Sequence, residues 1–146
     1  MSELIELTTE ECLALLRTKR VGRVGVVTPA GLVIFPVNYT LPDDTIVFRT
    51  LPYGVIANNA HQADVAFEVD SLDEAMREGW SVLATGRSHR IEDPNEVRVI
   101  REELDPEPWA DGLRNLYFRV DWTNLTGRQL GAGARPSLIP AASSAT

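Results

Sequence analysis

Residues 21–50 read VGRVGVVTPAGLVIFPVNYTLPDDTIVFRT, and they contain three β-rich runs joined by tight turns. The runs are residues 22–28, 32–39 and 45–50, and the turns are Pro29-Ala30-Gly31 and Leu41-Pro42-Asp43-Asp44. Connections this short join antiparallel strands, because a parallel crossover needs roughly a dozen residues or more. Pro36 lacks the backbone N–H that a sheet ladder requires, so it marks an edge, a bulge or a strand end. The stretch therefore predicts an antiparallel meander.

Further elements are expected on both sides of this meander. Thr8 and Glu11 have the spacing of a capping box, with Thr9 as the alternative cap, and predict a helix that buries Cys12. The basic residues Arg17, Lys19 and Arg20 are expected to close the C-terminal end of this helix. Downstream we expect strands at 63–70, 79–92 and 115–123, a short helix at 55–60 and a helix from Pro94 to about Leu104. The pattern predicts a mainly β domain of about six antiparallel strands with short helices, and closing its sheet into a barrel removes the edges.

The composition is that of one acidic globular domain. The chain has 146 residues, a formal net charge of −7 at pH 7 and a hydrophobic fraction of 44%. These values exclude a wholly disordered chain and argue against a nucleic-acid coat. The single cysteine cannot pair within the chain, and no apolar run reaches the roughly 18 residues of a membrane span. We expect a cytoplasmic domain at residues 1–130 and a flexible tail at 131–146, with no secretory signal, no nucleic-acid partner and no membrane partner.

The basic residues are almost all arginine, because Lys19 is the only lysine in the chain. Genomic base composition shifts lysine to arginine everywhere, whereas planar anion contacts select arginine at particular sites. The bias is global, which favours base composition.

Most motifs that carry chemistry are absent from the sequence. There is no phosphate-binding loop, no dinucleotide glycine fingerprint and no serine elbow. His61 and His89 have no neighbours at metal-ligand spacing, so no metal site is expected. Glu68 and Asp70 fall on one side of a strand, either as outward solubilising charges or as acids facing an interior polar site.

The end of the third run is the most suggestive segment. Arg49 and Thr50 end a strand, and Tyr53-Gly54 opens a short helix. A guanidinium, a hydroxyl and the amides of a helix start form a plausible phosphate site, although such a pair at a strand end is more often plain surface polarity.

Six short motifs, considered together, carry a family resemblance. They are Val21-Gly22-Arg23-Val24, Pro36-Val37-Asn38-Tyr39, Val47-Phe48-Arg49-Thr50, Val65-Ala66-Phe67-Glu68-Val69-Asp70, Gly79-Trp80-Ser81-Val82 with Gly86, and Leu125-Thr126-Gly127-Arg128. Their order and spacing resemble the pyridoxamine 5′-phosphate oxidase-like flavin-binding split barrels, in particular small members similar to nitroimidazole reductases. The resemblance extends from the N-terminal helix to about Leu130.

This resemblance implies a six-stranded split barrel that forms a homodimer, with two flavin sites at the subunit interface. FMN is the implied cofactor, and a deazaflavin is the alternative. By the resemblance, Arg49 and Thr50 hold the phosphate, and Gly54 and Val55 follow them in the same segment. The ring is flanked by Pro36, Val37, Asn38, Val47 and Phe48. The resemblance also implies that Trp80 and Ser81 approach the flavin site from strand 79–92. Ordinary barrel or interface packing is the other interpretation of Trp80.

Val55 departs from the family pattern, because related proteins commonly place a lysine there toward the phosphate. Losing one charge-assisted contact costs on the order of 1–3 kcal/mol, or about ten- to a hundredfold in FMN affinity. Another arginine can compensate, a different flavin-like cofactor can bind, or the site has lost its cofactor.

Two functions of different classes follow from the sequence. The first is a flavin-dependent oxidoreductase acting on an unknown small molecule, and the second is a non-catalytic split-barrel binding or sensor protein. No catalytic acid or base is identified, since Tyr39, Tyr53 and His61 are candidates only by proximity.

Overall fold

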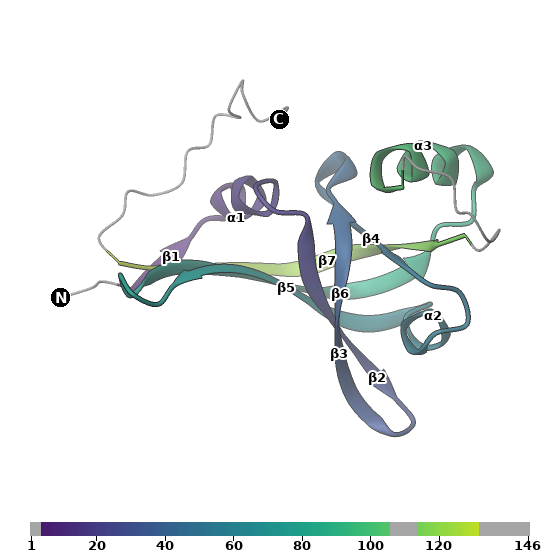
Figure 1. The fold of residues 1–146 in the computed structure, drawn as a ribbon, viewed down its shortest axis with the longest axis horizontal. Coiled ribbons are helices and arrows are strands. Elements are labelled where there is room, and N and C mark those ends of the chain that lie inside the picture. Colours follow the sequence, from purple (N-terminus) through teal and green to yellow (C-terminus); the bar gives the residue numbers. More distant parts are fainter. Residues whose placement is uncertain (1–3, 106–113, 132–146) are drawn as a thin grey trace.

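The structure, a computed structural model, describes residues 4–105 and 114–131. Its strands are β1 (Leu4–Leu7), β2 (Val21–Thr28), β3 (Gly31–Thr40), β4 (Ile46–Thr50), β5 (Ala63–Asp73), β6 (Glu78–Arg90) and β7 (Leu116–Leu130). Its helices are α1 (Thr9–Leu16), α2 (Val55–Asn59) and α3 (Pro94–Leu104), with a 3₁₀ turn at Pro42–Asp44. The expected tail lies outside the described residues from position 132 onward. Figure 1 shows the arrangement of these elements.

Antiparallel pairings close six of the described strands into a ring. The neighbours run β7-β4-β3-β2-β5-β6, and β6 pairs with β7 again to complete the circuit. β1 is added beside β7, where Leu4 faces Leu130 and Leu7 faces Gly127. The strand pairings differ in length, because β3 and β4 share two residue pairs whereas β5 and β6 share eleven. The predicted mainly β split barrel with short helices is confirmed.

Two elements differ from the sequence-based expectation at the ends of the chain. β1 was not predicted, because four residues are too few to show a period. β7 runs to Leu130 and not to about Thr123, since β6 and β1 pair with its two edges beyond that point. Pairing on both sides outweighs the weak strand propensity of residues 124–130.

Helix α1 also ends earlier than expected. Its N-cap is Thr8, which forms the predicted capping box with Glu11. The helix stops at Leu16, and its last turn carries no basic residue. Lys19 and Arg20 therefore lie in the connection to β2, where the carbonyl of Arg20 accepts the N–H of Tyr39 and starts the β2–β3 ladder.

Two buried clusters fill the fold. The larger lies inside the barrel under α1, where Tyr39 meets Phe67 edge-to-face at 5.0 Å and Phe48 stacks on Phe118 at 5.6 Å. Cys12 belongs to this cluster, as its helical position predicts, and burial raises the pKa of its thiol. The smaller cluster joins α3 to the outer face of the barrel through Val47, Ile91, Ile100 and Tyr117.

The β2–β3 hairpin extends beyond the barrel (Figure 1). Past Gly25, β2 pairs only with β3 among the described strands. This arm carries exposed apolar side chains, including Val27, Leu32 and Ile34, of which the last two are 79% and 70% exposed. Contiguous exposed apolar surface of this kind is typical of an interaction site.

Candidate functional site

A cavity of about 440 Å³ lies where β3, β4 and the start of α2 meet. We call it the Arg49 cavity, and it is lined by Phe35, Pro36, Val37, Asn38, Arg49, Thr50, Leu51, Gly54, Val55, Ile56 and Asn115. Its volume falls within the roughly 300–1,000 Å³ typical of small-molecule sites. Apolar side chains lie next to amide, hydroxyl and guanidinium groups, so one pocket can hold both a flat apolar ring and an anionic tail.

The alternation of β4 places Arg49 at this cavity. Phe48 points into the barrel, and Val47 points to the other face, which α3 covers. Arg49 lies two residues after Val47 and therefore reaches the same side, near the C-terminal end of α3. One terminal nitrogen of its guanidinium donates to the carbonyl oxygen of Leu104 at 2.7 Å and to the carboxylate of Asp105.

The other terminal nitrogen of Arg49 donates to Oδ1 of Asn38 at 3.0 Å. These three contacts leave Nε–H and one terminal N–H, because a guanidinium has five N–H donors. The Arg49 side chain is 27% exposed, so the remaining donors are accessible to a ligand. Arg49 is thus oriented before any ligand arrives, but its charge is already shared with a carboxylate.

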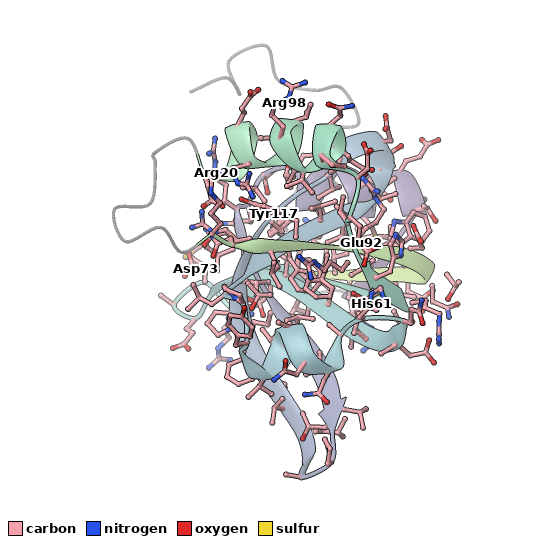
Figure 2. The ribbon with its side chains drawn as sticks, turned by 90° about the vertical axis from the view of Figure 1, so that its right-hand side faces the viewer. Arg20, His61, Asp73, Glu92, Arg98 and Tyr117 are labelled. Atoms are coloured by element: carbon pink, nitrogen blue, oxygen red, sulfur yellow. The ribbon has the colours of Figure 1, made fainter. Side chains whose placement is uncertain are left out.

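Asp105 is the buried partner that holds this guanidinium. Its side chain is 3% exposed, and its second oxygen accepts from Nδ2 of Asn115 at 2.9 Å and from the hydroxyl of Tyr117. Burial raises the pKa of Tyr117 to about 12, the bond to Asp105 adds to the rise, and the nearby Arg101 opposes it. The phenol therefore stays protonated as a donor, beneath the helix that carries Arg98 (Figure 2).

The structure brings together seven of the eleven residues that the sequence predicts to bind cofactor. Pro36, Val37, Asn38, Arg49, Thr50, Gly54 and Val55 all line the Arg49 cavity. Val47 and Phe48 lie next to it in sequence, but their side chains are fully buried in the two apolar clusters.

Trp80 and Ser81 line a different hollow of the same chain, between the β5–β6 turn and Leu4. The Val55 side chain is 45% exposed at the Arg49 cavity. Arg49 is the single charged residue of the described chain among the lining residues, so no second cation occupies the place of the expected lysine.

None of the three candidates named by proximity lines the Arg49 cavity. Tyr39 is buried and donates its hydroxyl to the carbonyl of Leu16, and burial raises the pKa of its phenol. Tyr53 is exposed. Nδ1 of His61 accepts the backbone N–H of Arg90, and Figure 2 shows His61 well away from Tyr117.

Sequence reasoning missed several positions of the candidate site. Phe35, Leu51, Ile56 and Asn115 line the cavity, and Asp105 fixes Arg49 from behind. The first three adjoin predicted residues and could have been included, whereas nothing local marks Asp105 as a partner of β4.

The acidic pair Glu68 and Asp70 forms an ion-paired cluster. Both carboxylates contact the same terminal nitrogen of Arg23, at 2.8 and 3.3 Å. Partial burial and the neighbouring Asp70 raise the pKa of Glu68, and Arg23 opposes this. Phe67 and Val69 alternate with them into the core, so the two acids lie on the outer face of β5, partly covered.

Within ranges 4–105 and 114–131, no group of three or more potential ligand residues is placed to hold a metal ion. In the same ranges, no helix combines the length and apolar character needed to traverse a bilayer.

Comparison with known proteins places the chain in a family. The family described as pyridoxamine 5′-phosphate oxidase matches residues 8–129, so the chain belongs to it, as the motif order suggested. An uncharacterized protein of Mycobacterium tuberculosis is 32% identical over 138 residues, covering 91% of this chain and 90% of that protein.

Solved structures agree with this assignment. A structure named as the FAD binding protein from Mycobacterium smegmatis matches with a TM-score of 0.75 and 28% identity, over 88% of this chain and 100% of that one. An FAD-binding protein from Mesorhizobium loti has the same fold, with a TM-score of 0.69 and 22% identity over 86% of this chain and 97% of that one.

Proposed function

We propose that this chain is a flavin-binding oxidoreductase that holds the flavin in the Arg49 cavity and acts on a small molecule. The observation that carries this proposal is the convergence of seven predicted cofactor-binding positions on one cavity of suitable size. Family membership and a 28% identical relative named for FAD binding support the same conclusion.

The lining residues fit a flavin in two parts. Pro36, Val37 and Ile56 offer an apolar surface on which a planar ring can lie. Arg49 and Thr50 would hold the first phosphate, through the free guanidinium N–H groups and the threonine hydroxyl. A bound flavin supplies hydride and electron transfer, while the protein orients it and keeps water from its ring.

The charge at the phosphate end is the weak point of this fit. Val55 contributes no cation, and Asp105 already neutralises part of Arg49. A terminal phosphate monoester carries nearly two negative charges on one phosphorus, whereas the diphosphate of FAD spreads its charge over two. We therefore propose FAD over FMN as the preferred flavin.

Fluorescence titration with FMN, FAD and a deazaflavin tests the proposal. We expect saturable binding of FAD, weaker binding of FMN by about tenfold, and turnover of the bound flavin with a reductant. Restoring the cation with Val55→Lys should tighten FMN binding by about tenfold, which corresponds to one charge-assisted contact. Val55→Met is the matched control, because it lengthens the side chain without charge. A wild-type protein that binds none of the three would overturn the assignment.

A non-catalytic binding protein of the same fold is the second candidate. The small positive charge beside Thr50 favours a binding protein. A chain that no longer catalyses a reaction would retain only weak phosphate binding. Reduction kinetics distinguish the two, because a binding protein would hold flavin without accelerating its reduction by any nicotinamide nucleotide.

We also propose that the chain forms a homodimer through the β2–β3 arm. The apolar side chains of Leu32 and Ile34 lie exposed there, and Pro36, two residues further along the same face of β3, reaches the Arg49 cavity. A partner seated on this arm would cover the open side of the cavity, consistent with a flavin site at a subunit interface.

Light scattering during gel filtration tests this assembly. The wild-type protein should elute as a dimer, and Leu32→Glu/Ile34→Glu should shift it to a monomer, because two charges would be buried at the interface. Val99→Glu, on an exposed position of α3, is the matched control and should leave the dimer intact. A wild-type monomer at all concentrations would rule out the homodimer.

A further inference from the structure

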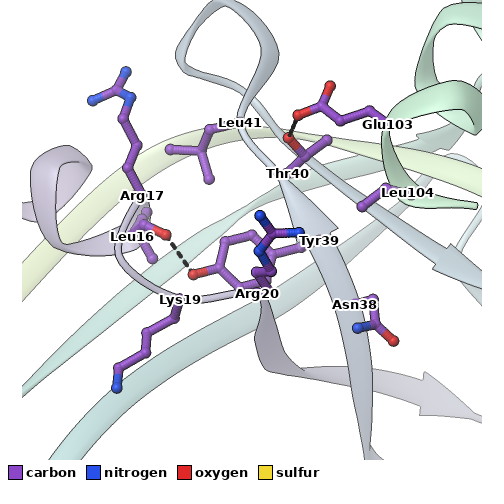
Figure 3. A pocket seen from close by; sticks show the side chains of 10 residues that line it. All are labelled: Leu16, Arg17, Lys19, Arg20, Asn38, Tyr39, Thr40, Leu41, Glu103 and Leu104. Carbon is purple, nitrogen blue, oxygen red and sulfur yellow. Dashed lines mark hydrogen bonds between the residues drawn. The ribbon is translucent and has the colours of Figure 1, made fainter. Parts of the chain in front are cut away.

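A second cavity of about 420 Å³ is also bordered by Asn38 (Figure 3). We call it the Lys19 cavity, and it is lined by Leu16, Arg17, Lys19, Arg20, Asn38, Tyr39, Thr40, Leu41, Glu103 and Leu104. It lies between the α1–β2 connection, the end of β3 and the end of α3, and none of the functions argued above uses it.

The Lys19 cavity gathers positive charge in an acidic protein. Three cations line it against one carboxylate, although the whole chain has a net charge of −7. Arg17 is ion-paired with Asp44. Within the described chain, no carboxylate forms an ion pair with Lys19 or Arg20, so these two charges remain available to a ligand.

The backbone that carries these cations is fixed before any ligand binds. The hydroxyl and the N–H of Thr18 both donate to the carbonyl of Leu15. The hydroxyl of Tyr39 donates to the carbonyl of Leu16, and its N–H donates to the carbonyl of Arg20. A loop held at both ends loses little conformational entropy on binding, which favours affinity.

The opposite wall of the Lys19 cavity carries a negative charge, which determines where in the cavity an anion would bind. Glu103 accepts the hydroxyl of Thr40 on the side of the cavity formed by α3 (Figure 3). An anion is repelled by this carboxylate and attracted by the two unpaired cations, so it would lie toward the α1–β2 connection.

The two cavities share a wall. Asn38 lines both, and its Oδ1 accepts from Arg49. Leu104 lines the Lys19 cavity, and its carbonyl also accepts from Arg49. A ligand in the Arg49 cavity and a ligand in the Lys19 cavity would therefore lie on neighbouring sides of the same hydrogen-bonded group.

We propose that the Lys19 cavity is a binding site for a phosphate-bearing group, held by Lys19 and Arg20. The group has two possible sources, the outer phosphate of a dinucleotide flavin bound in the Arg49 cavity or a separate phosphorylated small molecule. Only the first source rests on the proposed flavin function.

Inorganic pyrophosphate at constant ionic strength is the first probe, followed by amide chemical shifts of the full chain. Saturable shifts are expected at Lys19, Arg20 and Tyr39. Lys19→Ala/Arg20→Ala should weaken this binding at least tenfold, whereas Arg87→Ala, an exposed cation on β6, should not change it. The milder Lys19→Gln/Arg20→Gln serves if the alanine variant unfolds. Unchanged affinity in the double variant, or no saturable shift in these residues, would overturn the site.

Titration of the same variants with FAD and FMN identifies the source. A loss of at least tenfold for FAD with FMN unchanged assigns the site to the outer phosphate of the flavin. Loss of pyrophosphate binding with both flavins unaffected assigns it to a separate phosphorylated molecule. Pyrophosphate binding by a wild-type chain that takes up no flavin would leave this site standing and refute the flavin function alone.

Discussion

Arg49→Met is expected to lower the free energy of unfolding by about 3 kcal/mol. The substitution removes the cation from Asp105, whose side chain is 3% exposed and keeps only the neutral donors Asn115 and Tyr117. A buried carboxylate left without its ion-pair partner costs about 3–5 kcal/mol, and the partial exposure of Arg49 places this case at the low end. Urea denaturation measures the change.

The double variant Arg49→Met/Asp105→Asn separates this effect from lost packing. Replacing the carboxylate with an amide removes the unpaired charge, so the double variant should be more stable than Arg49→Met alone. Equal stability of the two would mean that the ion pair does not hold the end of α3 to β4. Flavin affinity of any Arg49 variant should be measured only where the variant is shown to be folded, because this arginine serves both roles.

Gly86→Ala is expected to destabilise the protein by about 3 kcal/mol, because β6 and β7 have no room for a methyl group at this position. An added Cβ would lie 2.3 Å from the carbonyl oxygen of Asp121 and 2.6 Å from Cα of Trp122. The register of the two strands shifts between Thr85 and Gly86, so the close approach belongs to an irregularity in the closing seam of the barrel. Thermal or urea denaturation gives the measurement.

Gly25→Ala is the matched control for this prediction. Gly25 is also a strand glycine, but the atom nearest to its added Cβ is Cβ of Ala66 at 3.8 Å, an ordinary contact. Its stability should stay within about 1 kcal/mol of the wild type. If both variants were equally destabilised, the cost would come from strand glycines in general and not from the seam.

The local elements of the fold could be predicted from the sequence, because alternation and turn residues act over a few positions. The run of residues 63–70 alternates as expected, with Phe67 and Val69 buried and Glu68 and Asp70 outside. β1 and the last half of β7 could not be predicted, because each is a strand chiefly through its pairing with a segment distant in sequence.

The candidate site likewise contains positions that a local motif indicates and positions that only distant segments of the chain supply. Residues 36–38 and 49–55 reach one cavity through adjacent strands, so a motif could indicate them. Asn115 reaches it because it precedes β7, which pairs with β4 at Thr50 and Leu116. Asp105 lies behind Arg49 only because α3 packs across Val47, which places the end of the helix beside Arg49. Lys19 was expected at the C-terminal end of the first helix, but α1 ends at Leu16 and Lys19 follows it. The second cavity, which Lys19 lines, could therefore not be predicted from the sequence.

The pairings of β7 bear on how the chain folds during synthesis. This strand contacts β1 (Leu4–Leu7), β4 (Ile46–Thr50) and β6 (Glu78–Arg90), all of which precede it in the sequence. The barrel therefore cannot close while β7 is still in the ribosomal exit tunnel, and the earlier strands must wait with unpaired edges. Contacts between such distant segments also slow closure itself. The nascent chain is thus expected to expose these strand edges until β7 is released.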